Sequence, residues 1–303
     1  MTDSAMRAEL AKDTARRIIL YSEPLDYRFP VASWEPDLVA LLAKKYSARH
    51  IDVVVAVTKS ALDFFTRYGE QLWPGARVVF HGIDAIEADQ IPPGAVGMVA
   101  QFDLASTIDI AQRLQPTARR ILFINGVGVL DLNFERQARL LAPTVTGTAK
   151  IEFLSGLPLP DLLARVAAEP ADTIIIFLTQ LGDRDGRAYT PRDVLQAVSR
   201  VSAAPVYGMY ETYVDHGIAA GSMEFLEDRG RLVARLVREA LAGTRYAPGK
   251  NVFTVASRCV ADARALRRWS LDPERLPAGC DVRFADRPYW REYLWQIALG
   301  LMV

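Results

Sequence analysis

The chain has 303 residues, with 36 basic and 36 acidic side chains, so its formal net charge is zero. At about 100–200 residues per domain, this length predicts two domains, and the balanced charge excludes the basic surface of a dedicated nucleic-acid-binding protein. The two cysteines, Cys259 and Cys280, are too few for a disulfide framework and lack zinc-site spacing. Whether they pair is open. We expect a folded globular protein without a cofactor or a structural metal.

The first expected element is a helix that begins near Thr2, where Thr2, Asp3 or Ser4 can cap it, and continues through Arg17. This stretch lacks the basic start, apolar core and small-residue cleavage site of a signal peptide. The sequence therefore shows no export signal.

Short apolar runs then predict strands that alternate with helices. The strands are expected at 17–21, 51–57, 77–80, 97–100, 120–124, 150–154, 173–178, 205–207 and 218–222. The helices are expected at 36–46, 59–68, 104–114, 131–141, 160–168, 192–201 and 227–241. Continuous β-branched runs are typical of strands buried on both faces, and hence of parallel sheets covered by helices. The strand–helix succession repeats over 17–100 and over 120–207. The sequence therefore predicts an α/β fold of two doubly wound parallel-sheet lobes.

Polar side chains follow six of these predicted strands. The candidate ligand-binding residues are Thr58, Lys59, Ser60, Asp84, Gln101, Asn125, Thr179, Gln180, Tyr210 and Glu211. Open α/β sheets bind ligands at the carboxyl ends of their strands, and the free N–H groups of a helix that begins at 58–60 suit an anion such as a carboxylate. Taken singly, each residue is better explained by ordinary capping and loop chemistry. Their convergence on one cleft between two lobes favours a binding site.

Most enzyme motifs are absent from the sequence. Gly126-Val127-Gly128 follows a strand, but Asp131 stands where a dinucleotide-binding fingerprint needs its third glycine. No P-loop and no G-x-S-x-G motif occurs. Asp131, Glu135 and Arg139 recur at i,i+4 spacing, which predicts a solvated helix face, and 182–187 is expected to be a solvated turn.

The C-terminal end differs from the rest of the chain. Tyr289, Trp290, Tyr293 and Trp295 are followed by an uncharged apolar run over 297–303. This order is typical of the interface and first turns of a membrane helix. An amphipathic helix that docks on the body of the protein is the alternative.

Several segments, taken in order, resemble one family. They are YSEPLD (21–26), RFP (28–30), DVVVAV (52–57), LWPG (72–75), VVF (78–80), GRAYTP (186–191), APVYG (204–208), ETY (211–213), LRRW (266–269), RLPAG (275–279) and DVRF (281–284). Together they resemble the extracytoplasmic sensor domains of bacterial, often hybrid, histidine kinases. Those domains are similar to the substrate-binding components of ABC transporters and have the type I periplasmic-binding-protein fold. The resemblance covers about residues 3–295.

The resemblance implies lobe one over 1–100 plus 214–249, lobe two over 101–213 plus 250–288, and a juxtamembrane segment with the start of a transmembrane helix over 289–303. It also implies that the family's first strand, which precedes the helix near Thr2, is missing here. The family's ligand cleft falls on the ten candidate residues named above, and Phe102 joins Tyr210 as a stacking wall.

The function implied is a non-catalytic sensor domain on the periplasmic, extracytoplasmic face of a bacterial inner membrane. It binds a small polar ligand, an amino acid or a carboxylate, and lobe closure signals to a membrane-linked histidine kinase. The implied partners are the ligand, the membrane and a second copy of the chain in a homodimer. Two alternatives stay open. One is a free-standing solute-binding component of an ABC transporter. The other is a Rossmann-like enzyme, for which only His81 with Asp84 offers an acid/base pair.

Overall fold

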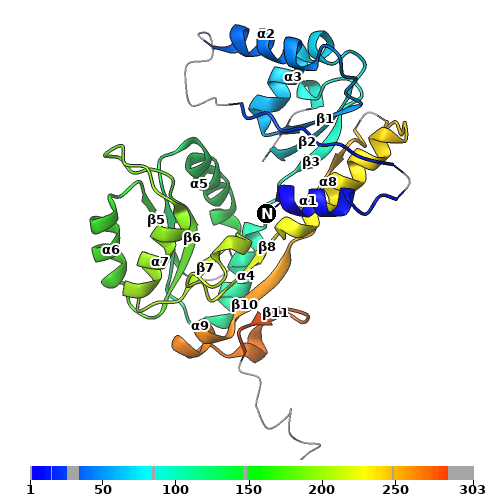
Figure 1. Cartoon of the computed structure of the whole chain (residues 1–303). Coiled ribbons are helices and arrows are strands. Elements are labelled where there is room, and N and C mark those ends of the chain that lie inside the picture. Colours follow the sequence, from blue (N-terminus) through cyan, green and yellow to red (C-terminus); the bar gives the residue numbers. More distant parts are fainter. Residues whose placement is uncertain are drawn as a thin grey trace, which may run out of the picture. The chain divides into compact units, whose positions relative to one another are not determined.

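The computed structural model describes residues 2–14, 16–25, 34–83, 86, 88–145, 149–247 and 249–285. The chain forms two compact units. Unit 1 comprises Met1–Gln101 and Glu224–Ser257, and unit 2 comprises Phe102–Met223 and Arg258–Val303. Figure 1 shows that each unit is built around its own parallel sheet.

Unit 1 contains a four-stranded parallel sheet in the order β1-β2-β3-β9. Its elements are the strands β1 (Val53–Val57), β2 (Arg77–Ile83), β3 (Val96–Val99) and β9 (Val252–Phe253), the helices α1 (Thr2–Leu10), α2 (Glu35–Tyr46), α3 (Lys59–Leu72) and α8 (Leu226–Leu241), and the short 3-10 helix η2 (Ala88–Gln90). Successive residues of β2 point to opposite faces: Val78 and Phe80 pack with Leu62 of α3, whereas Val79 belongs to the core formed with α1 and α8. Helices therefore bury both faces of this sheet, which explains its continuous apolar strands.

Unit 2 contains a second four-stranded parallel sheet in the order β5-β4-β6-β7. Its elements are the strands β4 (Arg120–Asn125), β5 (Lys150–Ser155), β6 (Thr173–Thr179) and β7 (Val206–Gly208), the helices α4 (Leu104–Leu114), α5 (Val129–Leu141), α6 (Leu159–Ala167) and α7 (Pro191–Val201), and the 3-10 helices η3 (Ala142–Thr144) and η4 (Glu211–Tyr213). Strand β6 is buried along its whole length. Its Ile174 and Ile176 share a core with residues of α4 and α5.

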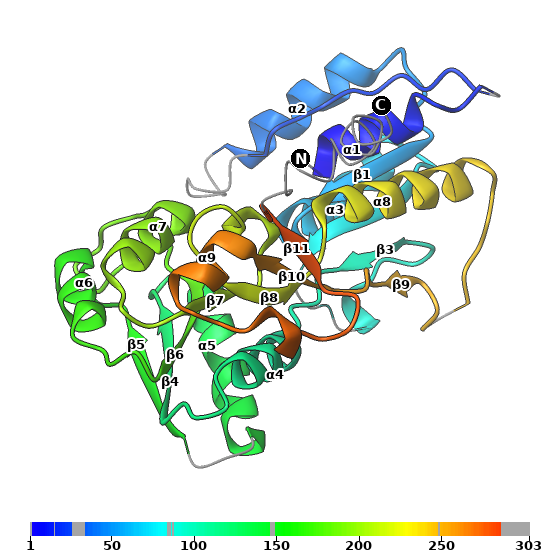
Figure 2. The same cartoon turned by 90° about the horizontal axis from the view of Figure 1, so that it is seen from below.

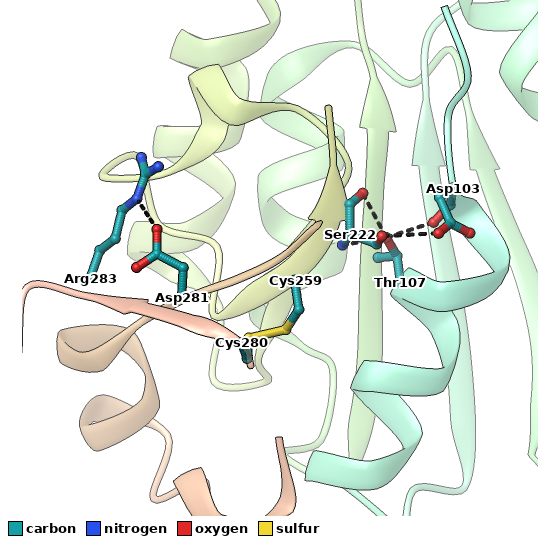
Figure 3. The surroundings of a disulfide bond; sticks show 7 residues. All are labelled: Asp103, Thr107, Ser222, Cys259, Cys280, Asp281 and Arg283. Atoms are coloured by element: carbon teal, nitrogen blue, oxygen red, sulfur yellow. Dashed lines mark hydrogen bonds and ion pairs between the residues drawn. A yellow bond between two sulfur atoms is a disulfide. The ribbon is translucent and has the colours of Figure 1, made fainter. Parts of the chain in front are cut away.

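A three-stranded sheet completes unit 2, in the order β11-β10-β8. Strand β10 (Arg258–Asp262) pairs antiparallel with β8 (Ala220–Met223) and parallel with β11 (Asp281–Arg283), while helix α9 (Ala263–Arg268) and the 3-10 helix η5 (Pro273–Arg275) lie between β10 and β11 in the chain. Figure 2 shows the three strands side by side. A disulfide bond joins Cys259 of β10 to Cys280, directly before β11 (Figure 3). The question that the sequence left open is thus answered: the two cysteines pair.

The structure confirms the predicted fold class, an α/β protein with parallel sheets and helices. Two predicted elements near the N-terminus are wrong. The first helix ends at Leu10 rather than Arg17, and 17–21 forms no strand within the described residues. The physical reason is exposure: Ile19 is 61% exposed and Tyr21 is 43% exposed, so this apolar run is not buried on two faces as a central strand would be.

The boundaries of the two units also differ from those expected for the lobes. Residues 214–223, expected in lobe one, belong to unit 2 because β8 pairs with β10. Residues 250–257, expected in lobe two, belong to unit 1 because β9 pairs with β3. Strands of two to five residues, such as β9 and β10, are too short for their pairing partner to be read from apolar periodicity.

Candidate functional site

The carboxyl end of β1 leads directly into helix α3 at Thr58. This residue has a positive φ of 82°, a region that β-branched residues rarely enter. Its backbone N–H donates to the carbonyl of His81 on the neighbouring strand β2, with an N–O distance of 2.8 Å. The Lys59 Nζ atom lies 2.5 Å from the Asp63 Oδ1 atom, one helical turn away. Thr58, Lys59 and Ser60 therefore sit together at the start of α3, as predicted, with Thr58 exposed to solvent.

A polar cluster in unit 1 joins Gln101, which follows β3, to Glu224 and Arg229 at the start of α8. The Glu224 Oε1 atom accepts the backbone N–H of Gln101 at 2.7 Å, and Glu224 Oε2 lies 3.7 Å from the Arg229 Nε atom of α8. Burial raises the pKa of Glu224 above its ordinary range, and the Gln101 N–H and Arg229 act in the opposite direction. Burial, followed by the nearby charge of Arg229, lowers the pKa of His81 to about 4. His81 is therefore neutral at pH 7. Sequence reasoning identified Gln101 but missed Glu224 and Arg229.

One candidate residue of this edge, Asp84, lies outside the described residues. The proposed pairing of His81 with Asp84 is therefore not placed. The aromatic and apolar segment 289–303 also lies outside the described residues. Among the helices that the structure describes, none is long and apolar enough to cross a membrane.

The polar residues at the carboxyl ends of β4 and β6 are buried rather than exposed. Asn125 is 0% exposed, Thr179 is 2% exposed and Gln180 is 1% exposed. The Asn125 Nδ2 atom donates to Glu135 Oε2 at 2.8 Å, and the Gln180 Nε2 atom donates to the Leu157 carbonyl at 2.9 Å. All three residues lie at the predicted edge of the sheet, and the Asn125 and Gln180 side chains form hydrogen bonds within unit 2.

The prediction that Asp131 lies on a solvated face of α5 is wrong. Its side chain is completely buried. Its carboxylate accepts the backbone N–H of Gly128 at 2.8 Å and that of Leu181 at 3.1 Å. Burial raises the pKa of Asp131, while the N–H groups of Gly128, Leu181 and Gly182 oppose that increase. The carboxylate thus caps the N-terminus of α5 and ties it to the loop after β6. A carboxylate three residues after the glycine N-cap is a capping signal that the sequence offered.

The loop 182–187 is also less solvated than its composition predicted. Asp183 is 1% exposed and accepts the backbone N–H groups of Asp185 and Arg187 and the hydroxyl of Tyr189. The Tyr189 hydroxyl and the two N–H groups hold the pKa of Asp183 below its usual range. The other charged side chains of the loop, Arg184, Asp185 and Arg187, are exposed to solvent.

Tyr210 and Glu211 follow β7, as predicted, and Tyr210 belongs to an aromatic cluster. Its ring centroid lies 5.0 Å from that of Phe102, 5.0 Å from that of Tyr213 and 5.9 Å from that of Phe134. The Tyr210 and Phe102 side chains are each half-buried. The predicted pair of aromatic residues is therefore in contact, with its remaining surface open.

Two segments that connect the units are tied together inside unit 2. The Ser222 Oγ atom donates to Asp103 Oδ2 at 3.0 Å, and the Ser222 N–H donates to Thr107 Oγ1 at 3.0 Å (Figure 3). Asp103 also accepts the N–H of Ser106 and so caps α4. The segments that follow Gln101 and precede Glu224 therefore run side by side, held by hydrogen bonds that the sequence did not reveal.

Among the described residues, no group of three or more histidine, cysteine, aspartate or glutamate side chains is placed to hold a metal ion. The groups that the structure brings together are capped helix ends, buried carboxylates and an aromatic cluster.

No protein-family model matches the chain, and no curated protein sequence matches it. Solved structures do match in fold. The ligand-free, open structure of a substrate-binding protein with adhesive properties from Clostridium difficile aligns with 93% of this chain and 94% of its own, at 13% identity and a TM-score of 0.65. An ABC domain from Streptococcus pneumoniae in complex with L-Trp aligns with 89% of this chain and 90% of its own, at 14% identity and a TM-score of 0.60.

A LacI transcriptional regulator from Lactobacillus brevis also aligns, over 85% of this chain and 92% of its own, at 11% identity and a TM-score of 0.53. These neighbours are binding proteins and a regulator. At such identities the likeness shows the fold alone, which is the type I periplasmic-binding-protein-like fold.

Proposed function

We propose that the chain is a non-catalytic binding domain for a small polar solute. The observation that carries this proposal is the fold: two units with parallel sheets, aligned over 93% of the chain with a substrate-binding protein. In open α/β sheets the carboxyl ends of the strands are the usual place for a ligand, and in both units candidate residues within the described part of the chain follow strands at that edge.

The proposed contacts of unit 1 are Thr58, Lys59 and Ser60, with Asp84 and the Gln101 side chain as further candidates. A helix N-terminus favours an anion, and the exposed start of α3 supports a ligand carboxylate there. The proposed contacts of unit 2 are Tyr210 and Glu211. Because Asn125, Thr179 and Gln180 are buried, we propose that they position the loops that carry the contacts rather than touch the ligand. Together these groups suit an amino acid better than a nucleotide.

We further propose that the domain works outside the cytoplasm. The disulfide between Cys259 and Cys280 supports this location, since such bonds persist in oxidising compartments and are rare in reducing ones. The fold neighbours named above include a substrate-binding protein, and they also include a LacI regulator. The disulfide is therefore the stronger support.

The signalling role is the finer part of the proposal. We propose that ligand binding changes the arrangement of the two units and so biases a membrane-linked histidine kinase, with the domain acting as a homodimer. A ligand can shift such an equilibrium only by its differential affinity for the two states. The alternative is a free-standing solute-binding component of an ABC transporter, which the substrate-binding neighbour favours. Ligand-dependent autophosphorylation in membranes identifies the sensor, and ligand-dependent uptake identifies the carrier.

A thermal-shift screen of the full chain against amino acids, carboxylates, sugars and polyamines tests solute binding. A ligand that binds only the folded state stabilises it by RT ln(1 + [L]/Kd), so a true ligand raises the melting temperature in a concentration-dependent way. Glu211→Ala is expected to weaken that response. Asp172→Ala is the matched control, because Asp172 is exposed and directly precedes β6 at the opposite edge of the sheet. A folded protein with no response to any of these solutes contradicts the proposal.

A further inference from the structure

Strand β11 forms one edge of the three-stranded sheet of unit 2. Among the strands that the structure describes, it has one neighbour, β10, with which it pairs in parallel from Asp281 to Arg283. Its side chains are accessible: Val282 is 37% exposed, and Phe284, directly after the strand, is 42% exposed. We call residues 281–284 the β11 edge. An accessible strand edge of this kind can pair with a further strand through its outward-pointing backbone groups.

The β11 edge is anchored at both of its ends. At the first end, Cys280 forms the disulfide bond with Cys259 of β10 (Figure 3). At the other end, the Arg264 guanidinium carbon lies 3.8 Å from the centre of the Phe284 ring. Arg264 is held in turn by Asp262, with an Nη2–Oδ2 distance of 2.6 Å. Because the strand is ordered in advance, it loses little conformational entropy when it pairs.

The two charges of β11 have opposite signs and lie two residues apart. The Arg283 Nε atom lies 3.0 Å from the Asp281 Oδ2 atom (Figure 3). Both side chains therefore lie on one face of the strand, and Val282 belongs to the other face. A two-fold axis at Val282 would place a second β11 antiparallel to the first. Asp281 of each copy would then lie directly opposite Arg283 of the other copy.

This charge pattern favours one arrangement of two identical strands. Directly opposite residues of an antiparallel pair have Cβ atoms about 4.5–5.5 Å apart, so opposite charges there stabilise the pair and like charges destabilise it. A parallel arrangement, or an antiparallel one centred on Asp281 or Arg283, would bring like charges together. A guanidinium has five N–H donors, so Arg283 can bind the Asp281 carboxylates of both copies. The charges of the β11 edge are therefore complementary to those of a second copy.

We propose that the β11 edge is the interface of a homodimer, in which two copies of β11 pair antiparallel across a two-fold axis at Val282. This inference rests on the homodimer of the proposed function and names the surface that forms it. A contact between two short strands buries little area, so the β11 edge supports a weak, concentration-dependent dimer.

Sedimentation velocity of the full chain over a concentration series tests this interface. Asp281→Arg places two like-charged pairs in it and is expected to weaken association about tenfold. The double variant Asp281→Arg, Arg283→Asp exchanges the two charges and is expected to restore association. Asp109→Arg is the matched control, because Asp109 is 56% exposed and also pairs with an arginine, Arg113 of α4. It should leave association unchanged. Circular dichroism checks that each variant is folded.

A cysteine at the two-fold axis tests the geometry independently of the charges. Val282→Cys is expected to form a covalent dimer on oxidation with copper phenanthroline, because the two Cβ atoms lie close to the separation of a disulfide. Peptide mapping should find the two introduced thiols joined to each other, with the bond between Cys259 and Cys280 intact. Val201→Cys is the control and should remain monomeric, since Val201 is 40% exposed at the end of α7.

The outcomes separate this interface from the function on which it rests. If the wild type dimerises and Asp281→Arg dimerises equally well, the homodimer stands and the β11 edge is not its interface. If the exchange of charges fails to restore the association that Asp281→Arg removes, or Val282→Cys gives no covalent dimer, the antiparallel pairing is wrong. If the wild type stays monomeric at every concentration, the interface and the homodimer both fail, whereas solute binding is still decided by the thermal-shift screen.

Discussion

The Oδ2 atom of Asp131 accepts a hydrogen bond of 2.8 Å from the backbone N–H of Gly128. Through this bond, a side chain of the protein itself provides the hydrogen-bond acceptor at the N-terminus of α5. The segment Gly126-Val127-Gly128 has the beginning of a dinucleotide-binding loop, and the same bond explains why the loop is not one. The carboxylate takes the N–H group that a pyrophosphate would need.

Replacing Asp131 with alanine should destabilise unit 2. The substitution leaves the partly buried N–H groups of Gly128 and Leu181 without their acceptor, which costs about 1–3 kcal/mol. Urea denaturation followed by circular dichroism measures this loss. Asp161→Ala is the control, because Asp161 occupies the first turn of the neighbouring helix α6 and is 60% exposed. Equal stability of the two variants would show that the Asp131 contacts contribute nothing.

Gly126→Ala should also be destabilising, for a steric reason. A Cβ atom on Gly126 would lie 2.3 Å from Asp131 Oδ2 and 2.4 Å from the Gly182 carbonyl oxygen, so the loop would have to move. Overpacking of this kind costs about 1–3 kcal/mol. At Gly182 a Cβ atom would meet only the Arg187 carbonyl oxygen, at an ordinary 3.5 Å, so Gly182→Ala should be close to neutral. A tolerant position 126 contradicts the described loop geometry.

His81 should make the stability of unit 1 depend on pH. Burial lowers its pKa from 6.5 to about 4 in the folded chain, so the unfolded chain binds the proton first as the pH falls. The stabilisation is therefore complete above pH 6.5 and is lost progressively as the pH falls toward 4, by about 3 kcal/mol in total.

Urea denaturation at pH 7, 5.5 and 4 checks this dependence. Between pH 7 and pH 4 the wild type should lose about 3 kcal/mol more than His81→Gln, which cannot titrate. His50→Gln controls for the loss of an exposed histidine, since the His50 side chain is 75% exposed. Parallel pH profiles for the wild type and His81→Gln would rule out a buried neutral His81.

The disulfide should contribute strongly to the stability of unit 2. Its half-cystines are 21 residues apart, and closing a loop of this length restricts the unfolded chain by about 3 kcal/mol. The double variant Cys259→Ser, Cys280→Ser should lose about that amount in denaturant titrations under oxidising conditions. A thiol assay of the unreduced, denatured protein should find no free thiol. Two titratable thiols would contradict the pairing and remove the main support for an extracytoplasmic location.

The sheets could be predicted from the sequence because their strands are unusually uniform. Strand β6 reads TIIIFLT and is buried along its whole length, so a continuous apolar run was a sufficient signal. The segment 17–21 reads similarly, RIILY, but Ile19 and Tyr21 are exposed there. The composition of an apolar segment shows only that it is suited to burial. Whether it is buried depends on whether the rest of the fold provides a neighbouring strand and a covering helix.

The candidate site could be predicted in position but not in burial. Asn125, Thr179 and Gln180 do lie at the ends of their strands, yet all three are buried, and Asn125 and Gln180 bind Glu135 of α5 and the Leu157 carbonyl. Asp131 shows the converse. Its i,i+4 spacing with Glu135 predicted a solvated face, and the acceptor it provides for Leu181, 50 residues away, lies beyond any local pattern. Long-range hydrogen bonds of this kind require the three-dimensional structure.

Isothermal titration calorimetry of the full chain with an amino acid found by thermal shift tests solute binding most directly. We predict saturable binding of one ligand per chain, weakened by Thr58→Ala in unit 1 and by Glu211→Ala in unit 2, and unchanged by Asp172→Ala at the opposite edge of the unit 2 sheet. A folded chain that shows no saturable heat, or binding that neither edge variant weakens, would contradict the proposed function.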